Sequence, residues 1–179
     1  MPQEQLKKFN QRISHHSLPR WKDLPELELY MDQVIVLMQK YLGPYMLSED
    51  LVTPSMINNY VKMNVLPAPI KKKYSKLHIA RLLVICLMKR QLPIPIISRM
   101  IEEQACASGM DVFFNSFVEA YESEFKKATE SIFIQEEPLV CALKFAVSAA
   151  VNHTMAESAV NIITLQNEDP NNKDPKKKQ

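Results

Sequence analysis

The chain has 179 residues, of which 46% are hydrophobic and 8% aromatic, a composition that suits one or two globular domains and excludes a disordered protein. Only two glycines, Gly43 and Gly109, are present, which disfavours a β-rich fold with many tight turns. The 22 basic and 20 acidic residues leave a net charge of +2, but residues 51–101 contain nine Lys or Arg and no Asp or Glu. This basic segment favours a polyanionic partner, because separated charge concentrates positive potential on one part of the surface.

The sequence lacks the common signatures of catalysis. It contains no P-loop, no glycine-rich phosphate loop and no Ser/His/Asp order, so we predict no enzymatic activity and no cofactor. Its three cysteines have unrelated spacings, which disfavours a disulfide framework or a zinc site, and Cys86 and Cys141 are interpreted as small buried residues. His153 and Glu157 have the spacing of a metal-binding pair on a helix, but we expect no metal there.

The sequence also lacks an obvious membrane signal. No apolar run approaches the roughly 20 residues of a bilayer span, and the amino terminus lacks the apolar core of a signal peptide. We therefore predict a cytoplasmic protein with no membrane association.

The first long helix is predicted over residues 25–42. Residues 1–24 form a polar N-terminal arm around Trp21, for which a free arm and a short packing helix are both open. Pro25 suits the first helical position, acidic residues follow in the first turn, and apolar residues recur every 3.6 positions up to Gly43. A brief helix is also expected within residues 45–52.

The basic segment begins with a short predicted helix. Thr53 is a good N-cap, followed by Pro54 at the first helical position. The sequence Leu66-Pro-Ala-Pro69 ends this helix, since neither proline can continue it. Residues 71–74 then read as a short, basic, extended loop.

Two further helices complete the basic segment. Ser75 is predicted to cap the first of them, which carries a broad apolar surface. Pro93 and Pro95 break it, and a short helix over 96–104 closes at about Gly109.

Beyond Gly109 the chain becomes acidic, and residues 102–169 contain 12 acidic and three basic residues. A helix is predicted from Asp111 with an aromatic stripe, which we interpret as core packing rather than a ligand pocket; it comprises Phe114, Phe117, Tyr121 and Phe125. A second helix, 139–165, contains the almost fully apolar Phe145–Val151 run, which is expected to be buried in a core or at a subunit contact. Residues 167–179 are predicted to be disordered.

The helix from Thr53 to Met63 is the candidate element for reading DNA. Its polar positions are expected to point away from the core and carry no negative charge; they are Ser55, Asn58, Asn59 and Lys62. Asn suits bidentate contact with adenine, and Lys suits guanine or a phosphate. Lys71, Lys72 and Lys73 would lie against the flanking phosphate backbone. Each feature alone is more typical of a solvated surface, and only their coincidence favours DNA.

This order of residues resembles the winged helix-turn-helix of MerR-type transcription regulators. The similar pattern is Thr-x-x-x-Ile-x-x-Tyr, then Leu-Pro-x-Pro, then Tyr-x-x-x-x-Ile-x-Arg-Leu, carried by Thr53, Ile57, Tyr60, Leu66, Pro67, Pro69, Tyr74, Ile79, Arg81 and Leu82. The motifs MINNYVK, from Met56, and KKYS, from Lys72, are similar to those of a bacterial MerR-like family of short proteins known as a domain of unknown function.

The resemblance covers residues 25–105 and implies roles for particular positions. It places Asn58, Asn59 and Lys62 toward the groove or the phosphates, and Lys72 on the wing. It does not extend to the long dimer helix or the sensor cysteines of MerR-type proteins. Dimer geometry, promoter twisting and metal sensing are therefore not implied.

Together these features predict an all-α protein with two domains, a winged helix-turn-helix over 25–108 and an acidic helical dimerisation or effector domain over 109–166. The predicted function is sequence-specific binding of double-stranded DNA, as a homodimeric transcriptional repressor. Its DNA-binding residues are predicted to be Ser55, Asn58, Asn59, Lys62, Lys71, Lys72, Lys73 and Tyr74. The alternative is a helical protein–protein adaptor that does not bind DNA. A small-molecule or protein effector is left open.

Overall fold

The structure is a computed structural model that describes residues 4, 8, 11, 16–45, 52–130 and 137–168. Its regular elements are all helical, and these residues contain no strand, which confirms the predicted all-α class. In chain order the elements are a 3₁₀ helix η1 (Trp21–Asp23) and the α-helices α2 (Met31–Leu42), α3 (Pro54–Lys62), α4 (Lys76–Met88), α5 (Ile94–Ser108), α6 (Met110–Glu130) and α7 (Pro138–Glu168). The helix expected within 45–52 falls mostly outside the described residues, as does the tail from 169.

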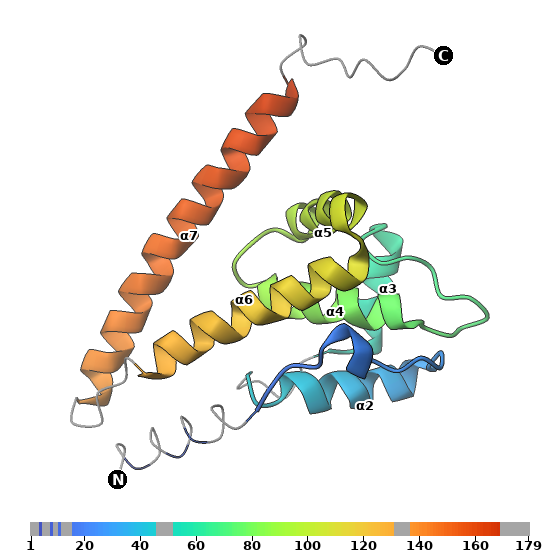
Figure 1. Cartoon of the computed structure of the whole chain (residues 1–179), viewed down its shortest axis with the longest axis horizontal. Coiled ribbons are helices and arrows are strands. Elements are labelled where there is room, and N and C mark those ends of the chain that lie inside the picture. The colour runs from blue at the N-terminus through green and yellow to red at the C-terminus, as the bar shows by residue number, and fades with distance from the viewer. Residues whose placement is uncertain are drawn as a thin grey trace. The chain divides into compact units, whose positions relative to one another are not determined.

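Helix α4 forms the centre of the first compact unit, residues 1–136. It contacts α2, α5 and α6, and Figure 1 shows it between α2 on one side and α5 and α6 on the other. Nine of its 13 residues are buried, as its broad apolar surface predicted. Such a helix needs neighbours on several sides, which is why the others assemble around it.

Helix α2 begins at Met31, six residues later than predicted. The preceding residues stay extended, because the backbone of Leu29 pairs with that of Tyr74. Tyr30 then serves as the N-cap, and its N–H donates to Oε1 of Gln33 at 2.9 Å. A contact between residues far apart in the chain therefore overrides the local helix signal of Pro25.

Helix α6 packs on α4 and α5 and belongs to the same compact unit. The chain divides at Glu136 and Glu137 and not at the predicted boundary 108/109. The reason is the aromatic stripe of α6, whose Phe114 is fully buried in the shared core. Core packing of this residue was expected, but the sequence assigned it to a separate domain.

The polar arm docks on α6 through its last residues. The Leu18 N–H donates to Oε1 of Glu122 at 2.8 Å, and Arg20 forms an ion pair with the same carboxylate at 2.7 Å. The Trp21 ring packs edge-on against Phe114, with 6.3 Å between the ring centroids. The sequence left open a free arm or a short packing helix, and the described part of the arm forms a short packing helix, η1.

Helix α7 belongs to the second unit, residues 137–179. It is the one helix in the described part of the chain that is long and apolar enough to cross a membrane, judged by length and composition only. This was not expected, because the sequence contains no uninterrupted apolar run of that length. Only 6% of its most apolar window, Pro138–Ile162, is buried. Phe145–Val151 is therefore not buried in a core within this unit, and its burial at a subunit contact stays a prediction.

Candidate nucleic-acid interface

Helix α3 starts and stops at defined signals. The Thr53 hydroxyl oxygen accepts the Met56 N–H at 3.2 Å, and Pro54 occupies the first turn, which confirms the predicted N-cap. Ile57 and Tyr60 turn inward and are buried. Burial raises the pKa of Tyr60 to about 12.

The four polar positions predicted on this helix are all exposed, and they are Ser55, Asn58, Asn59 and Lys62. No acidic residue lies on the helix to oppose an anion. The outer face of α3 therefore offers hydroxyl, amide and ammonium groups on a rigid scaffold, which is the chemistry that base edges and phosphates require.

The exit from α3 is held by Arg81, a residue that the charge count treated as part of the basic surface. Asn64 takes a left-handed conformation (φ 56°), and the Val65 and Leu66 N–H groups both donate to the Tyr60 carbonyl. The Arg81 guanidinium lies 3.5 Å from the Val65 carbonyl oxygen and 3.6 Å from a Glu102 carboxylate oxygen, and it is mostly buried. Arg81 therefore joins the α3 exit to α4 and α5, and its charge is largely used inside the protein.

Residues 70–73 form a two-residue hairpin, which we call the lysine hairpin. Ile70 and Lys73 exchange backbone hydrogen bonds of 3.1 and 2.9 Å. The two tip residues, Lys71 and Lys72, both have positive φ, at 50° and 65°. This is the conformation of a type I′ turn, for which Asn-Gly is preferred and Lys-Lys is strained. Such strain is often kept where the side chains have a function.

The base of the lysine hairpin is anchored by Tyr74. The Tyr74 side chain is only 3% exposed, and its ring packs edge-on against His78 at 5.5 Å between centroids. Of the eight residues predicted to contact DNA, Tyr74 is thus the one with a buried side chain. Lys73 is partly exposed, and its ammonium group lies over the Tyr30 ring, 5.4 Å from the ring centroid.

His78 links the hairpin base to the start of α4. Its Nδ1 accepts the Ser75 N–H at 3.0 Å and lies 2.8 Å from the Ser75 hydroxyl. Burial lowers the pKa of His78, an effect that outweighs the nearby Ala68 and Pro67 carbonyl oxygens, which raise it. The neutral imidazole that accepts the Ser75 N–H is therefore the favoured form. The capping role of Ser75 was predicted, whereas the role of His78 was missed; the Ser-x-x-His spacing is the sequence signal that identifies it.

The exposed cations of the site are not neutralised by neighbours. Within the described residues, no carboxylate pairs with Lys62, Lys71 or Lys72, whereas Lys76 pairs with Glu26. Figure 1 shows α3 and the segment between α3 and α4 at one end of the first unit. Their positive charges can therefore act on one anionic partner.

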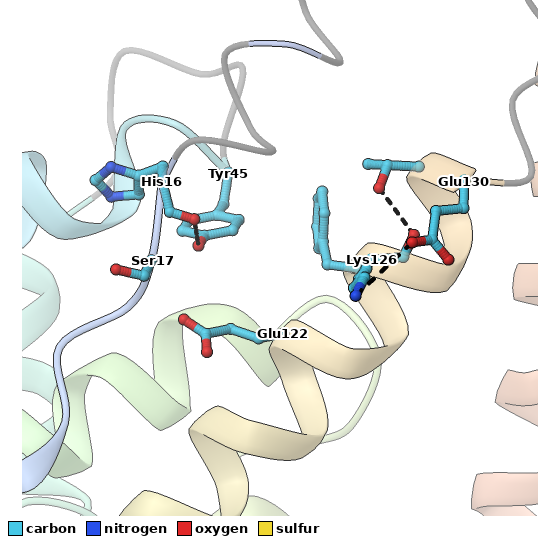
Figure 2. Close-up of a pocket in the computed structure, with 8 residues that line it drawn as sticks. His16, Ser17, Tyr45, Glu122, Lys126 and Glu130 are labelled. Atoms are coloured by element: carbon cyan, nitrogen blue, oxygen red, sulfur yellow. Dashed lines mark hydrogen bonds and ion pairs between the residues drawn. The ribbon is translucent and has the colours of Figure 1, made fainter.

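A separate pocket of about 370 Å³ lies between the arm, Tyr45 and one face of α6. Figure 2 shows Glu122 below His16 and Tyr45, with Lys126 and Glu130 further along α6. The Tyr45 hydroxyl donates to the His16 carbonyl at 3.1 Å, and burial together with Glu122 raises its pKa to about 12. Glu122 is already paired with Arg20, while the buried Nε2 of His16 has no hydrogen-bond partner within the described residues.

No metal centre is present in the described part of the chain, where no three His, Cys, Asp or Glu side chains gather. His153 Nε2 and a Glu157 oxygen lie 3.5 Å apart, which is a pair without a third ligand. Cys86 and Cys141 are buried, as predicted, and burial raises the pKa of Cys86 to about 11.

The fold and this site define a small helical domain with one basic, exposed end. A family model described as Domain of unknown function (DUF1836) matches residues 19–124, more than half of the chain, and the protein belongs to this family. The match runs from η1 into α6 and includes the whole candidate interface. No curated protein and no solved structure gives a significant match to the chain.

Proposed function

We propose that the protein is a sequence-specific DNA-binding transcriptional regulator of the MerR-like winged helix-turn-helix type. The observation that carries the proposal is that the exposed polar face of α3 occurs together with a strained hairpin whose Lys71 and Lys72 have no carboxylate partner among the described residues. A strained turn of two lysines contributes nothing evident to the core. It is well suited to contact phosphates.

In this proposal α3 is the recognition helix and the lysine hairpin is the wing. Asn58 and Asn59 contact base edges in the major groove, while Ser55 and Lys62 contact bases or the adjacent phosphates. Lys71 and Lys72 contact the flanking backbone and contribute affinity without sequence information. Tyr74 acts indirectly, as the buried anchor that positions the wing.

The simplest regulatory action is repression by a homodimer. Occupying a promoter is sufficient for repression, whereas activation requires contact with polymerase or distortion of DNA. One recognition helix contacts only a few base pairs, and a second copy doubles the readout. The exposed apolar surface of α7 supports pairing of two chains.

The test is binding to labelled random-sequence duplexes across salt concentrations, followed by selection of bound sequences from a random pool. Phosphate contacts predict that log affinity falls linearly with log salt, by about 0.9 for each phosphate neutralised. Selection should enrich a short motif. Binding that is undetectable at about 50 mM salt would contradict the proposal.

The alternative is an adaptor that binds another protein and not DNA. The exposed apolar residues of α7 are the observation that favours it, since such surfaces mark interaction sites. Failure to bind any duplex together with a stable folded monomer would favour this alternative.

A further inference from the structure

Helix α7 carries a continuous row of large exposed side chains, spaced four residues apart, which we call the α7 ridge. The five residues and their exposed fractions are Leu139 (81%), Leu143 (64%), Val147 (56%), Val151 (57%) and Met155 (65%). A monomeric soluble protein rarely leaves so many neighbouring large apolar side chains in water. The ridge therefore points to a partner surface.

The spacing of the ridge determines how two such helices can pack. Four residues exceed one helical turn by roughly 40°, so the row is inclined to the helix axis rather than parallel to it. Rows of this kind interdigitate when two helices cross at about −50°, because each row then lies along a groove of the other helix. Val147 is the middle residue of the row, so a symmetric pair has its two-fold axis near Val147.

The opposite side of α7 has a different composition. Ala142, Ala149 and Ala156 follow one another at intervals of seven residues, on the side away from Val147. Small side chains can face water at little cost, whereas the ridge cannot. A pair formed through the alanine side would leave Leu143, Val147 and Val151 in solvent, so burial favours the ridge as the seam.

The ridge exposes an area close to that of a small dimer interface. Together with the exposed Val140 it provides six large side chains. At roughly 100 Å² each they expose about 600 Å² per copy, somewhat less than the roughly 800 Å² per partner of a standard stable interface. A second copy of α7 covers the residues nearest Val147, where two crossing helices approach each other most closely.

A lipid bilayer suits α7 less well than a second copy. Six polar residues fall within 152–161, namely Asn152, His153, Thr154, Glu157, Ser158 and Asn161. The more apolar part, residues 139–151, is about 20 Å long as a helix, which is shorter than the roughly 30 Å of a bilayer core. It also contains Lys144.

We infer that α7 is a homodimerisation helix that packs against α7 of a second chain through the ridge of Leu139, Leu143, Val147, Val151 and Met155, with the two-fold axis near Val147. This inference specifies the dimer in the proposed function. It does not require that the dimer bind DNA.

Cysteine cross-linking of the full chain tests the seam. In a C106S/C141S background, Val147→Cys is compared with Ala149→Cys, an exposed position two residues away on the other side of the helix. Oxidation or a short thiol–thiol cross-linker should convert most of the Val147→Cys chains to covalent dimers and few of the Ala149→Cys chains. Preferential cross-linking at Ala149→Cys, equal cross-linking at both positions, or none at either overturns the inference.

Sedimentation of variants without added cysteines gives a second, independent readout. Val147→Glu should convert a micromolar dimer to a monomer, while Ala149→Glu should remain dimeric, and equal thermal unfolding of unit 1 shows that both chains fold. A wild-type monomer, or wild-type chain that floats with phosphatidylcholine vesicles, overturns the inference. These experiments contain no DNA, so they test only whether α7 forms the dimer. Whether the protein binds DNA is decided by the separate duplex-binding measurements.

Discussion

Leu29 and Tyr74 bind each other through their backbones, with the Leu29 N–H donating to Tyr74 O at 2.9 Å and the Tyr74 N–H donating to Leu29 O at 2.8 Å. This pair joins the entry of α2 to the base of the lysine hairpin, and the buried Tyr74 side chain fixes it to α4. The base of the hairpin is therefore held by backbone hydrogen bonds and by a buried side chain, so its two tip lysines, Lys71 and Lys72, project from a rigid base.

Neutralising the hairpin tip should weaken DNA binding without changing sequence preference. We expect K71Q/K72Q to lose affinity similarly for all duplexes and to reduce the slope of log affinity against log salt by about 2, because two phosphate contacts are lost. Fluorescence anisotropy at several salt concentrations measures both quantities. The matched control is K126Q/K127Q, which removes the same charge from lysines that pair with Glu130 and Glu124 on α6. Equal effects from the two variants would contradict a specific role of the hairpin.

Changing the amides of α3 should alter specificity instead. We expect Asn58→Ala or Asn59→Ala to relax preference at particular base pairs by roughly 1–3 kcal/mol, the value of a good bidentate contact, with the salt slope unchanged. Selection from random duplexes with each variant measures this. Both side chains are exposed, so thermal unfolding should be unaffected. If the variants prefer the same base as the wild type at every position, neither residue contributes to sequence recognition.

Relieving the strain of the hairpin should separate stability from function. Lys71 and Lys72 adopt positive φ, which Asn and Gly tolerate better. We expect K71N/K72G to raise the free energy of unfolding by about 1 kcal/mol while weakening DNA binding as much as K71Q/K72Q. Urea unfolding compares these two double variants, and K71Q/K72Q should show no such gain. Stability that is unchanged in K71N/K72G would argue against strain at the tip.

Acidification should destabilise the fold through His78. Its pKa lies below the ordinary value of about 6.5, because burial disfavours the imidazolium. The unfolded chain therefore takes up the proton first as pH falls, so the contribution of His78 to stability is complete above about pH 6.5 and is lost below it. Protonation also removes the Nδ1 acceptor of the Ser75 N–H.

The pH dependence can be assigned by substitution. His78→Asn keeps a side-chain acceptor near the Ser75 N–H and removes the titrating group. We expect its urea midpoint to change less between about pH 7.5 and 5.5 than that of the wild type, in the range where His titrates. Parallel curves for the two proteins would show that other groups cause the acid sensitivity.

Local sequence signals were sufficient to predict many of the helices and most of the residues of the candidate interface. The Thr53 cap starts α3, and the polar positions Ser55, Asn58, Asn59 and Lys62 are exposed as the helical period predicts. The helix ends at Lys62, before the left-handed Asn64, and not at the prolines after Leu66 as predicted. Ser75 likewise marks the start of α4. These features depend on residues within one or two turns of each other, so a single sequence contains the information needed to place them.

The sequence by itself thus determined the helical class, the charge of residues 51–101 and the start of α3. Tertiary structure alone decided that α2 begins at Met31, that Tyr74 is buried, that Lys71 and Lys72 adopt positive φ, and that α6 joins the first unit. Each of these depends on contacts between distant segments, such as Leu29 with Tyr74. The free energy of such contacts exceeds the small free-energy differences that set the local conformational preferences of one or two residues. These contacts cannot be predicted from a short segment of sequence.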